Sequence, residues 1–446
     1  ITLDPAVRYY GHRAKDGRLE INGNIYTSSN ITATYGVAVQ NRYTVLPVTE
    51  EVLLNSGYVV DMSNSSGSVG IQSLAGARAV NKGKVIVGNS SSASAGIGIL
   101  AESSTTNLTS VVNDSGAVIE MPYAGIGIYL DSLELGGSVT NAGTISSTQA
   151  NALGIYAKMS SAGVLGAPIT TIANTGSINL SDNGFGIFTD NSTITNSGNI
   201  TVDNPGTNSI IAIYGGRNSI INNTGGNISV GEGGIAFYGN NTAMTISGGN
   251  FSTEGGTLIY AENNTNITYT ANGTTLGNKI GIYLDQSKID LGGKNFSVMD
   301  SGSAIYLLGA NAEAKSLGTM TLGNNSEGAY VKNSMMNLLG GTMNITGSNS
   351  TGIIGINSNI ENTTAINANI SAGSFENKGL LVKVDDGGTY TIRNKAAINI
   401  TGANSLGIYG STLDSSGNIL GALNIINENN INMGSASDIN NMLMGI

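Results

Sequence analysis

Short runs in which apolar residues alternate with small or polar ones recur along most of the chain. The clearest run reads Gly-Ile-Gly-Ile-Tyr at 125–129, and variants of it return roughly every 23 to 32 residues. A period of two is typical of a half-buried strand, whereas a helix repeats every 3.6 residues. Ile, Val, Thr and Tyr dominate the runs and suit a pleated surface. The pattern predicts many short strands and no amphipathic helix.

A second run alternates with the first and reads Asn-x-Gly-x-Ile. It occurs at 141–145, 174–178 and 196–200, with a looser form at 340–345. Clusters of Gly, Asn and Ser separate the runs and supply residues that tolerate positive φ at tight corners. Further copies of the first run lie at 96–100, 154–156, 186–188, 211–214, 234–238, 258–260, 281–284, 304–307, 328–331 and 407–409.

The repeat length matches one coil of a stacked architecture. Coiling lets each strand pair in parallel with its equivalent one coil later, so that no long sheet edge is left exposed. Inward Ile, Val and Leu then form apolar columns, and corner Asn and Thr form hydrogen-bonded ladders. The sequence therefore predicts an all-β fold, a right-handed parallel β-helix (β-solenoid) with coils of roughly 23–32 residues. The handedness follows from the general preference of parallel crossovers.

Residues 1–54 depart from this pattern, and we expect the β-solenoid proper over 55–446. A solenoid must cover its terminal apolar layer, so the first segment is interpreted as a cap or as incomplete first coils. A recognition surface is the alternative. The residues that set segment 1–54 apart from the repeats are Arg8, Tyr9, Tyr10, His12, Arg13, Lys15, Arg18, Arg42 and Pro47.

The composition limits where the protein can act and which partners it can bind. Only 11% of the 446 residues are charged although 40% are hydrophobic, so a large core lies under a surface of uncharged polar residues. Cysteine is absent, which favours export through an oxidising compartment.

With 19 Lys and Arg against a net charge of -10, we expect no nucleic-acid partner. No apolar stretch is long enough for a membrane helix, so this segment is not expected to insert itself. Because it begins at Ile1, we expect a mature product or a fragment.

Catalytic signatures are weak. The single histidine, His12, leaves little scope for an activated nucleophile. Asn113-Asp114-Ser115-Gly116 and Asp385-Asp386-Gly387-Gly388 are interpreted as turns between coils. The nonapeptide repeat that builds stacked calcium sites is missing. We therefore expect no catalytic residues, no metal site, no cofactor and no enzymatic activity.

Tyrosines at the end of the first run carry the most interesting pattern. If the coils are in register, Tyr129, Tyr156, Tyr214, Tyr260, Tyr283, Tyr306 and Tyr409 form one aromatic column. Structural stacking is one interpretation. The other is a platform for sugar rings, bordered by Arg217, Glu262 and Asp285. The candidate ligand-binding residues are Tyr9, Tyr10, Arg13, Tyr214, Arg217, Tyr260 and Tyr283.

The two runs resemble the passenger regions of type Va autotransporter adhesins, especially the large fusobacterial outer-membrane adhesins of the RadD-like family. The resemblance covers roughly 55–444. It implies an Asn-, Gly- and Ile-rich β-helix on the bacterial cell surface or secreted, anchored through a C-terminal barrel that this sequence does not contain. No residue-level binding motif transfers from it.

The sequence thus favours a cell-surface adhesin passenger that binds glycans or proteins on host cells or other bacteria through many weak contacts. A structural subunit of an extracellular fibre or surface layer is the alternative. A polysaccharide-degrading enzyme is a remote third interpretation, because it would require clustered acids on one face.

Overall fold

The computed structural model consists of strands and turns, in two compact units that are described separately: Ile1–Tyr238 and Gly239–Ile446. No helix occurs among the described residues, and so none there is long and apolar enough to cross a membrane. The residues described are 10–15, 17–27, 31–32, 35–40, 51–90, 93–104, 107–132, 136–159, 170–181, 183–203, 210–253, 255–277, 279–338, 340–368, 376–400 and 404–433.

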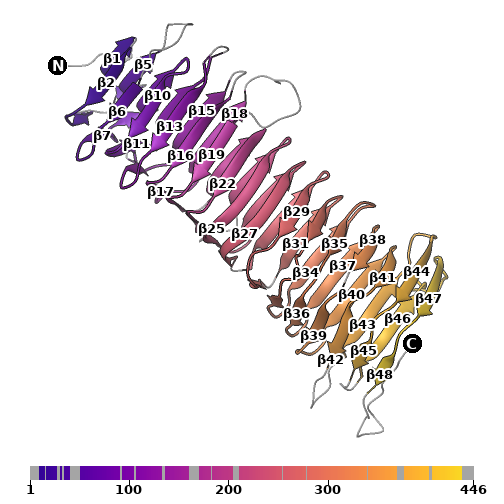
Figure 1. The fold of residues 1–446 in the computed structure, drawn as a ribbon. Coiled ribbons are helices and arrows are strands. Elements are labelled where there is room, and N and C mark those ends of the chain that lie inside the picture. The colour runs from indigo at the N-terminus through magenta and orange to yellow at the C-terminus, as the bar shows by residue number, and fades with distance from the viewer. Residues whose placement is uncertain are drawn as a thin grey trace. The chain divides into compact units, whose positions relative to one another are not determined.

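Each coil of the first unit contributes to one sheet through the Gly-Ile-Tyr run. Its strands are β1 (Tyr10–Lys15), β5 (Tyr35–Gln40), β9 (Val69–Leu74), β12 (Gly96–Glu102), β15 (Gly125–Ser132), β18 (Leu153–Met159), β21 (Phe185–Asp190), β24 (Ile211–Gly216) and β26 (Ile235–Asn240). Neighbouring strands of this sheet pair in parallel, as in Ile128 opposite Ile155. Figure 1 shows successive strands lying side by side.

The Asn-x-Gly-x-Ile run forms two further strand rows of this unit. The first row holds β2 (Arg18–Ile21), β6 (Glu51–Leu54), β10 (Arg78–Asn81), β13 (Thr109–Asn113), β16 (Gly137–Asn141), β19 (Thr170–Asn174), β22 (Ser192–Asn196) and the start of β25 (Ile220–Val230). The second holds β3 (Ile25–Tyr26), β7 (Val59–Met62), β11 (Lys84–Val87), β14 (Val118–Met121), β17 (Thr144–Ser147), β20 (Ser177–Leu180), β23 (Asn199–Val202) and the end of β25; β4 (Ile31–Thr32) pairs with β8 (Ser65–Ser66).

The second unit repeats the three-row plan. One row holds β28 (Thr257–Glu262), β31 (Ile280–Asp285), β34 (Ser303–Leu308), β37 (Glu327–Lys332), β40 (Thr351–Ile356), β43 (Lys378–Lys383) and β46 (Leu406–Ser411). Another holds β30 (Thr274–Leu276), β33 (Phe296–Val298), β36 (Thr319–Leu322), β39 (Thr342–Ile345), β42 (Ala365–Ala368), β45 (Ile398–Ile400) and β48 (Ile431–Met433). The remaining strands are β27 (Ala243–Ser252), β29 (Asn266–Tyr269), β32 (Lys288–Asp290), β35 (Glu313–Lys315), β38 (Met335–Leu338), β41 (Asn359–Asn362), β44 (Thr389–Asn394) and β47 (Ala422–Asn427).

The fold is a right-handed parallel β-helix, as the repeat predicts. Paired residues are displaced along the chain by between 22 positions, Asn174 to Asn196, and 35 positions, Ile25 to Val60. This range is close to the coil length that the sequence indicates. Inward side chains such as Ile128 and Ile155 are 0% exposed, so each coil buries its apolar residues on those of its neighbours. Each such side chain contributes roughly 1.5–3 kcal/mol.

Buried asparagines form the ladder that the second run predicts. In the first unit each side-chain amide nitrogen donates to the side-chain oxygen of the next coil at 2.7–2.8 Å. The ladder runs through Asn81, Asn113, Asn141, Asn174, Asn196 and Asn223. In the second unit a similar ladder joins Asn362, Asn394 and Asn427 at 2.7 Å. Thr and Ser also take part, since Thr265 Oγ1 accepts from the Thr242 N–H.

The glycine of the Asn-x-Gly-x-Ile run is required by packing against the preceding coil. A Cβ built on Gly176 would lie closer than 3.0 Å to the carbonyl oxygen of Gly143, and one on Gly198 would meet Gly176 in the same way. The obstructing atoms belong to the backbone and cannot rotate aside. The run therefore encodes one buried hydrogen-bonding residue and, two positions later, one residue without a side chain.

The described part of the first 54 residues contributes strands to the same sheets. β1 pairs with β5, and β2 pairs with β6 in parallel. Glu51, whose side chain is 13% exposed, accepts from Arg18 at 3.2 Å and from Arg78 at 2.6 Å. Charges therefore alternate across three successive coils here. A domain boundary at residue 54 and a capping role stay predictions.

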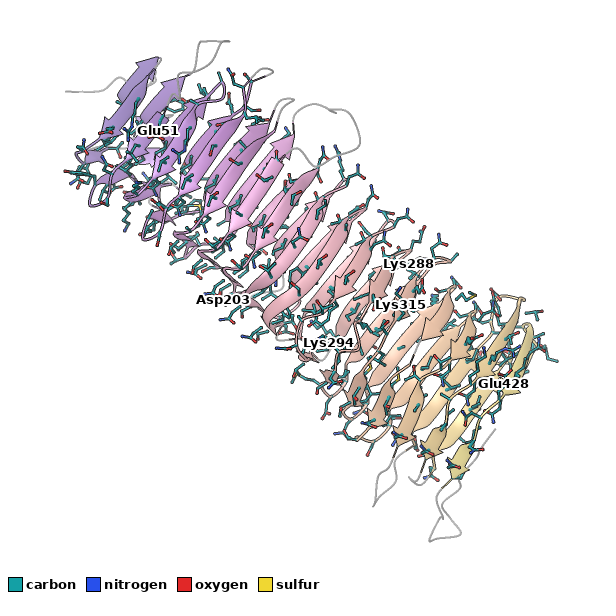
Figure 2. The ribbon with its side chains drawn as sticks, in the orientation of Figure 1. Glu51, Asp203, Lys288, Lys294, Lys315 and Glu428 are labelled. Atoms are coloured by element: carbon teal, nitrogen blue, oxygen red, sulfur yellow. The ribbon has the colours of Figure 1, made fainter. Side chains whose placement is uncertain are left out.

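Outward charges in the second unit are paired across coils in a similar way. Lys288 contacts Glu313 at 3.2 Å, and Lys315 contacts Asp290 at 3.5 Å, so β32 and β35 exchange two ion pairs in register. Figure 2 labels Lys288 and Lys315 among the side chains of these coils. Exposed pairs of this kind contribute roughly 0–1 kcal/mol each, so they adjust the register more than the stability.

Candidate functional site

The tyrosines at the end of the first run form a stacked column in the first unit. Tyr129 stacks on Tyr156 with ring centroids 5.2 Å apart, and Phe188 stacks on Tyr214 at 4.3 Å with the rings 6° from parallel. Tyr156 meets Phe188 edge-on at 5.6 Å, and Tyr214 stacks on Tyr238 at 5.0 Å. The parallel register places one ring on each coil, so the column follows directly from the pairing.

A second column occupies the second unit. Tyr260, Tyr283, Tyr306 and Tyr330 stack in succession, with centroids 4.5, 5.3 and 4.7 Å apart. Beyond Tyr330 the same register position is taken by Ile354, Leu381 and Tyr409, and Tyr409 is 45% exposed. The sequence identified most members, but Phe188, Tyr238 and Tyr330 were not assigned to the column.

Stacking limits what each column offers a ligand. The rings within a column cover one another's faces, so their edges and hydroxyls are what remains available. A sugar binds best on a free aromatic face. The geometry therefore supports the structural interpretation of the columns, and leaves a role for their edges in a broad contact surface.

Carboxylates follow the columns two residues after several of the rings. Tyr129 donates its hydroxyl to Asp131 at 3.3 Å. In the first unit Asp131 also adjoins Glu102 in register, and burial together with Asp131 raises the pKa of Glu102. In the second unit Glu262 and Asp285 occupy the corresponding position. Carboxylates thus border parts of both columns, while Lys158 and Lys332 occupy the same register position on other coils.

Burial of the rings and the neighbouring carboxylates raise the pKa of several column tyrosines, which an alkaline titration can detect. The pKa of Tyr283 is raised from 10.0 to about 12. Burial is the largest cause, and the charges of Tyr260, Asp285 and Tyr306 add to it. Burial and Asp131 raise the pKa of Tyr129 to about 12 as well. As the pH rises, the folded protein keeps these hydroxyl protons to a higher pH than the unfolded chain does. The stability that the two protonated tyrosines contribute to the fold is therefore fully present below pH 10 and is lost as the pH rises toward 12.

We expect ultraviolet difference titration to show a group of tyrosines that ionises late, and unfolding to accompany it. Tyr283→Phe should remove one late-ionising group while preserving the stack. Ionisation of all tyrosines in a single step near pH 10 would contradict this account.

Arg217 lies beside the first column, at a corner with φ of 45°. Its side chain is 83% exposed and approaches Asp190 at 3.7 Å. Burial raises the pKa of Asp190, and Arg217 opposes that rise. A Cβ on Gly216 would lie within 3.0 Å of both Asp190 Oδ1 and the Tyr214 hydroxyl, so this glycine leaves room for the two groups to meet. The structure thus brings Tyr214 and Arg217 together.

The other predicted ligand-binding residues are distributed differently. Tyr260 and Tyr283 adjoin one another in the second unit. Tyr10 and Arg13 belong to β1, in register with Tyr35 and Ala38. Tyr9 lies outside the described residues. Among the six candidates that the structure describes, Tyr260 stacks on Tyr283, and Tyr214 and Arg217 both lie beside Asp190.

The corners predicted at the two Asp-containing motifs are turns. Asp114 Oδ1 accepts from the Ser115 N–H at 2.9 Å, and Asp386 Oδ1 accepts from the Gly388 N–H at 2.9 Å. In the described ranges, no three His, Cys, Asp or Glu side chains come close enough to hold a metal ion.

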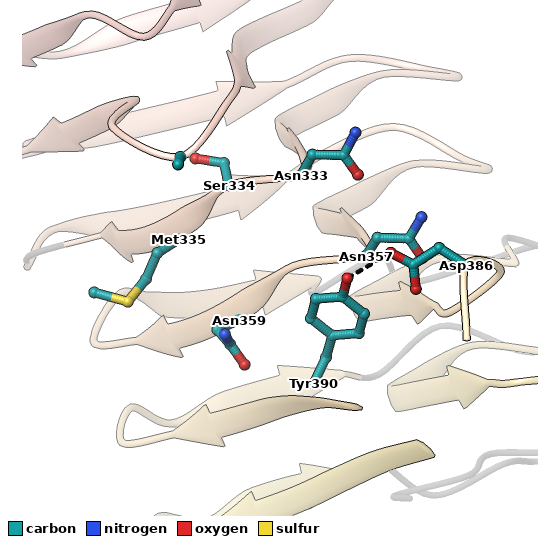
Figure 3. Close-up of a pocket in the computed structure, with 8 residues that line it drawn as sticks. Asn333, Ser334, Met335, Asn357, Asn359, Asp386 and Tyr390 are labelled. Carbon is teal, nitrogen blue, oxygen red and sulfur yellow. Dashed lines mark hydrogen bonds between the residues drawn. The ribbon is translucent and has the colours of Figure 1, made fainter. Parts of the chain in front are cut away.

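A groove in the second unit was not anticipated from the sequence. It has a volume of about 530 Å³ and is shown in Figure 3. Tyr390 and Asp386 line it together with asparagines of the preceding coils. A smaller hollow of about 340 Å³ in the first unit is lined by residues that include Tyr58, Lys82 and Lys84. The groove beside Tyr390 combines one aromatic ring with several polar side chains.

Residues 12–226 match the BigA third pectate lyase-like domain, and the matched stretch is just under half of the chain. It lies entirely within the first unit. The similarity agrees with the right-handed parallel β-helix. A search of curated proteins finds no match.

Proposed function

We propose that this chain is the adhesive passenger of a bacterial surface protein. The observation that carries the proposal is repetition on the outer surface: ring positions recur from coil to coil within each unit, as in Tyr129 opposite Tyr156 and Tyr283 opposite Tyr306. A surface with repeated rows suits many weak contacts, whose combined avidity exceeds that of any single contact. The partners are glycans or proteins of host cells or other bacteria.

Two further observations support a surface setting. The similarity of residues 12–226 to a BigA domain favours a bacterial surface protein. The chain contains no cysteine and has a surface dominated by uncharged polar residues. Membership of the type Va autotransporters, and of their fusobacterial RadD-like group, is the finer form of this proposal and rests on the two repeated runs. The proposal includes no catalytic step, since a pectate lyase-like description names a fold.

The test is binding of the labelled, purified chain to epithelial cells and to partner bacteria, with free sugars and amino acids as competitors. Saturable binding that a competitor reduces is expected. A chain that circular dichroism shows to be folded but that binds neither cell type would contradict the proposal. If the same preparation forms filaments whose amount rises with concentration, the fibre-subunit alternative replaces it.

A further inference from the structure

The groove beside Tyr390 arises where four successive coils turn the same corner, and Ala310 lines it from the first of these corners, residues 309–312 between β34 and β35. Between β37 and β38 the corner comprises residues 333–334, and between β40 and β41 it comprises 357–358. Between β43 and β44 it is longer and comprises 384–388. This longer corner supplies Asp386 to one wall of the groove.

Tyr390 is held in a fixed orientation at this wall. A Cβ on Gly388 would lie 2.7 Å from the ring atom Cε2, so the ring rests directly on the main chain of Gly388. Its hydroxyl donates to Asp386 Oδ2 at 2.6 Å, as Figure 3 shows. Unlike the rings of the two columns, Tyr390 stacks on no other aromatic side chain within the described part of the chain. The ring that lines the groove is therefore not covered by an aromatic neighbour.

The floor and rim provide hydrogen-bonding groups with unused capacity. Asn359 Oδ1 accepts from the Thr391 N–H at 2.8 Å, and its amide nitrogen has no partner among the described residues. Likewise, the exposed side chain of Asn333 has no hydrogen-bond partner within the ranges described. Asp386 retains acceptor capacity beyond its bonds from Tyr390 and Gly388.

The corner that carries Asp386 is itself braced. Asn357, which is 7% exposed, donates to Asp385 Oδ1 at 2.8 Å and accepts from the Asp385 N–H at 2.9 Å. Hydrogen bonds from Tyr390 and Gly388 hold the pKa of Asp386 below its usual range, so it is a charged acceptor at neutral pH. A rigid wall reduces the ordering that a ligand must impose on binding.

Charge restricts the class of ligand. The groove is lined by Ala310, Asn333, Ser334, Met335, Asn357, Asn359, Asp386 and Tyr390, a set with one carboxylate and no cation. Lys383, the nearby base of this corner, already contacts Asp385 at 3.6 Å. A sulfated, phosphorylated or carboxylated ligand would face Asp386 without a compensating charge. A neutral ligand with one apolar face and several hydroxyls meets no such opposition.

We propose that this groove binds a neutral sugar residue of a surface glycan. Its apolar face packs on Tyr390, and its hydroxyls bond to Asp386, Asn359 and Asn333. The volume of about 530 Å³ lies within the roughly 300–1,000 Å³ of small-molecule sites. The inference names the ligand class for one site of the proposed adhesin and so rests on that function.

The test uses the full chain with defined oligosaccharides, measured by isothermal titration calorimetry and ligand-observed NMR. Neutral probes are lactose, mannotriose and N-acetylchitotriose, and acidic probes are sialyllactose and a heparin tetrasaccharide. We expect at least one neutral probe to bind, and the acidic probes to bind at least about tenfold more weakly. Preferred binding of an acidic probe would overturn the inference.

Variants locate the site. Tyr390→Ala should weaken neutral-sugar binding by about tenfold or more, because the stacking face is lost. Asp386→Asn, which preserves the size of the side chain, and Tyr390→Phe, which preserves the ring, should each weaken it by roughly threefold. Tyr409→Ala is the matched control: it removes an exposed tyrosine of the same unit that does not line the groove. Sugar binding that survives Tyr390→Ala in a folded protein would place the sugar elsewhere and overturn the inference.

The two proposals fail in different ways. If the chain adheres to cells but binds none of the neutral probes, the groove is not the sugar site and the adhesin stands. If the chain binds a neutral probe through Tyr390 but adheres to no cell, the groove inference stands and the adhesive role falls.

Discussion

Replacing Asn141 with alanine is expected to destabilise the first unit by about 3 kcal/mol. Asn141 is fully buried, accepts from Asn113 at 2.7 Å and donates to Asn174 at 2.7 Å. Its removal leaves the Asn113 amide with only a long bond to the Thr144 carbonyl at 3.4 Å and takes the ladder donor from the Asn174 oxygen, and each unsatisfied buried group costs about 1–3 kcal/mol. Denaturant unfolding followed by circular dichroism measures the change.

Asn179→Ala is the matched control for this ladder. Asn179 lies on β20 of the same unit, with its side chain exposed, so its replacement should change the free energy of unfolding by less than about 0.5 kcal/mol. Equal effects of the two substitutions would show that the ladder adds nothing beyond the propensity of asparagine at a strand position.

Gly176→Ala is expected to cost about 3 kcal/mol or more for a different reason. The new Cβ would fall closer than 3.0 Å to the carbonyl oxygen of Gly143 and to the carbonyl carbon of Ala142. Because both atoms are backbone, two coils must separate, and overpacking of this kind costs typically about 1–3 kcal/mol, occasionally more. Hydrogen–deuterium exchange should accelerate in the strands on both sides, β17 (Thr144–Ser147) and β23 (Asn199–Val202).

Gly225→Ala provides the comparison, since a Cβ there would meet nothing closer than 3.7 Å. It should be close to neutral. If Gly176→Ala were tolerated equally well, the glycine of the Asn-x-Gly-x-Ile run would not be set by contact between coils.

The periodicity of the chain was sufficient to predict the strands, the coil and the ladders. Alternation in Gly-Ile-Gly-Ile-Tyr sets which side chains face inward, and the repeat distance sets which strand lies opposite, so Ile128 meets Ile155 and Tyr129 meets Tyr156. Both consequences follow from the pattern within one run and from the distance to the next run. The corner at Asp114 could be predicted for the same reason, because a turn depends on four adjacent residues.

The groove beside Tyr390 could not be predicted by that reasoning. It depends on a difference in length between corners about 24 to 30 residues apart, and on a ring that departs from the repeated position. The one available signal was Asp385-Asp386-Gly387-Gly388, which the sequence identified as a turn. Nothing in the periodicity indicates that the longer turn supplies a side chain to a groove.

Pairing confined to adjacent coils has an evolutionary consequence. Along the asparagine ladder of the first unit, neighbouring coils offer each other the same backbone groups and an asparagine amide, and coils such as those of Gly143, Gly176 and Gly198 also a glycine gap. A duplicated coil would therefore find a complementary surface on both sides, and a deleted coil would leave two compatible surfaces to meet. Recombination between repeats can change the number of coils without redesigning a core. Features such as the long corner at 384–388 can then vary independently on a scaffold whose interfaces do not change.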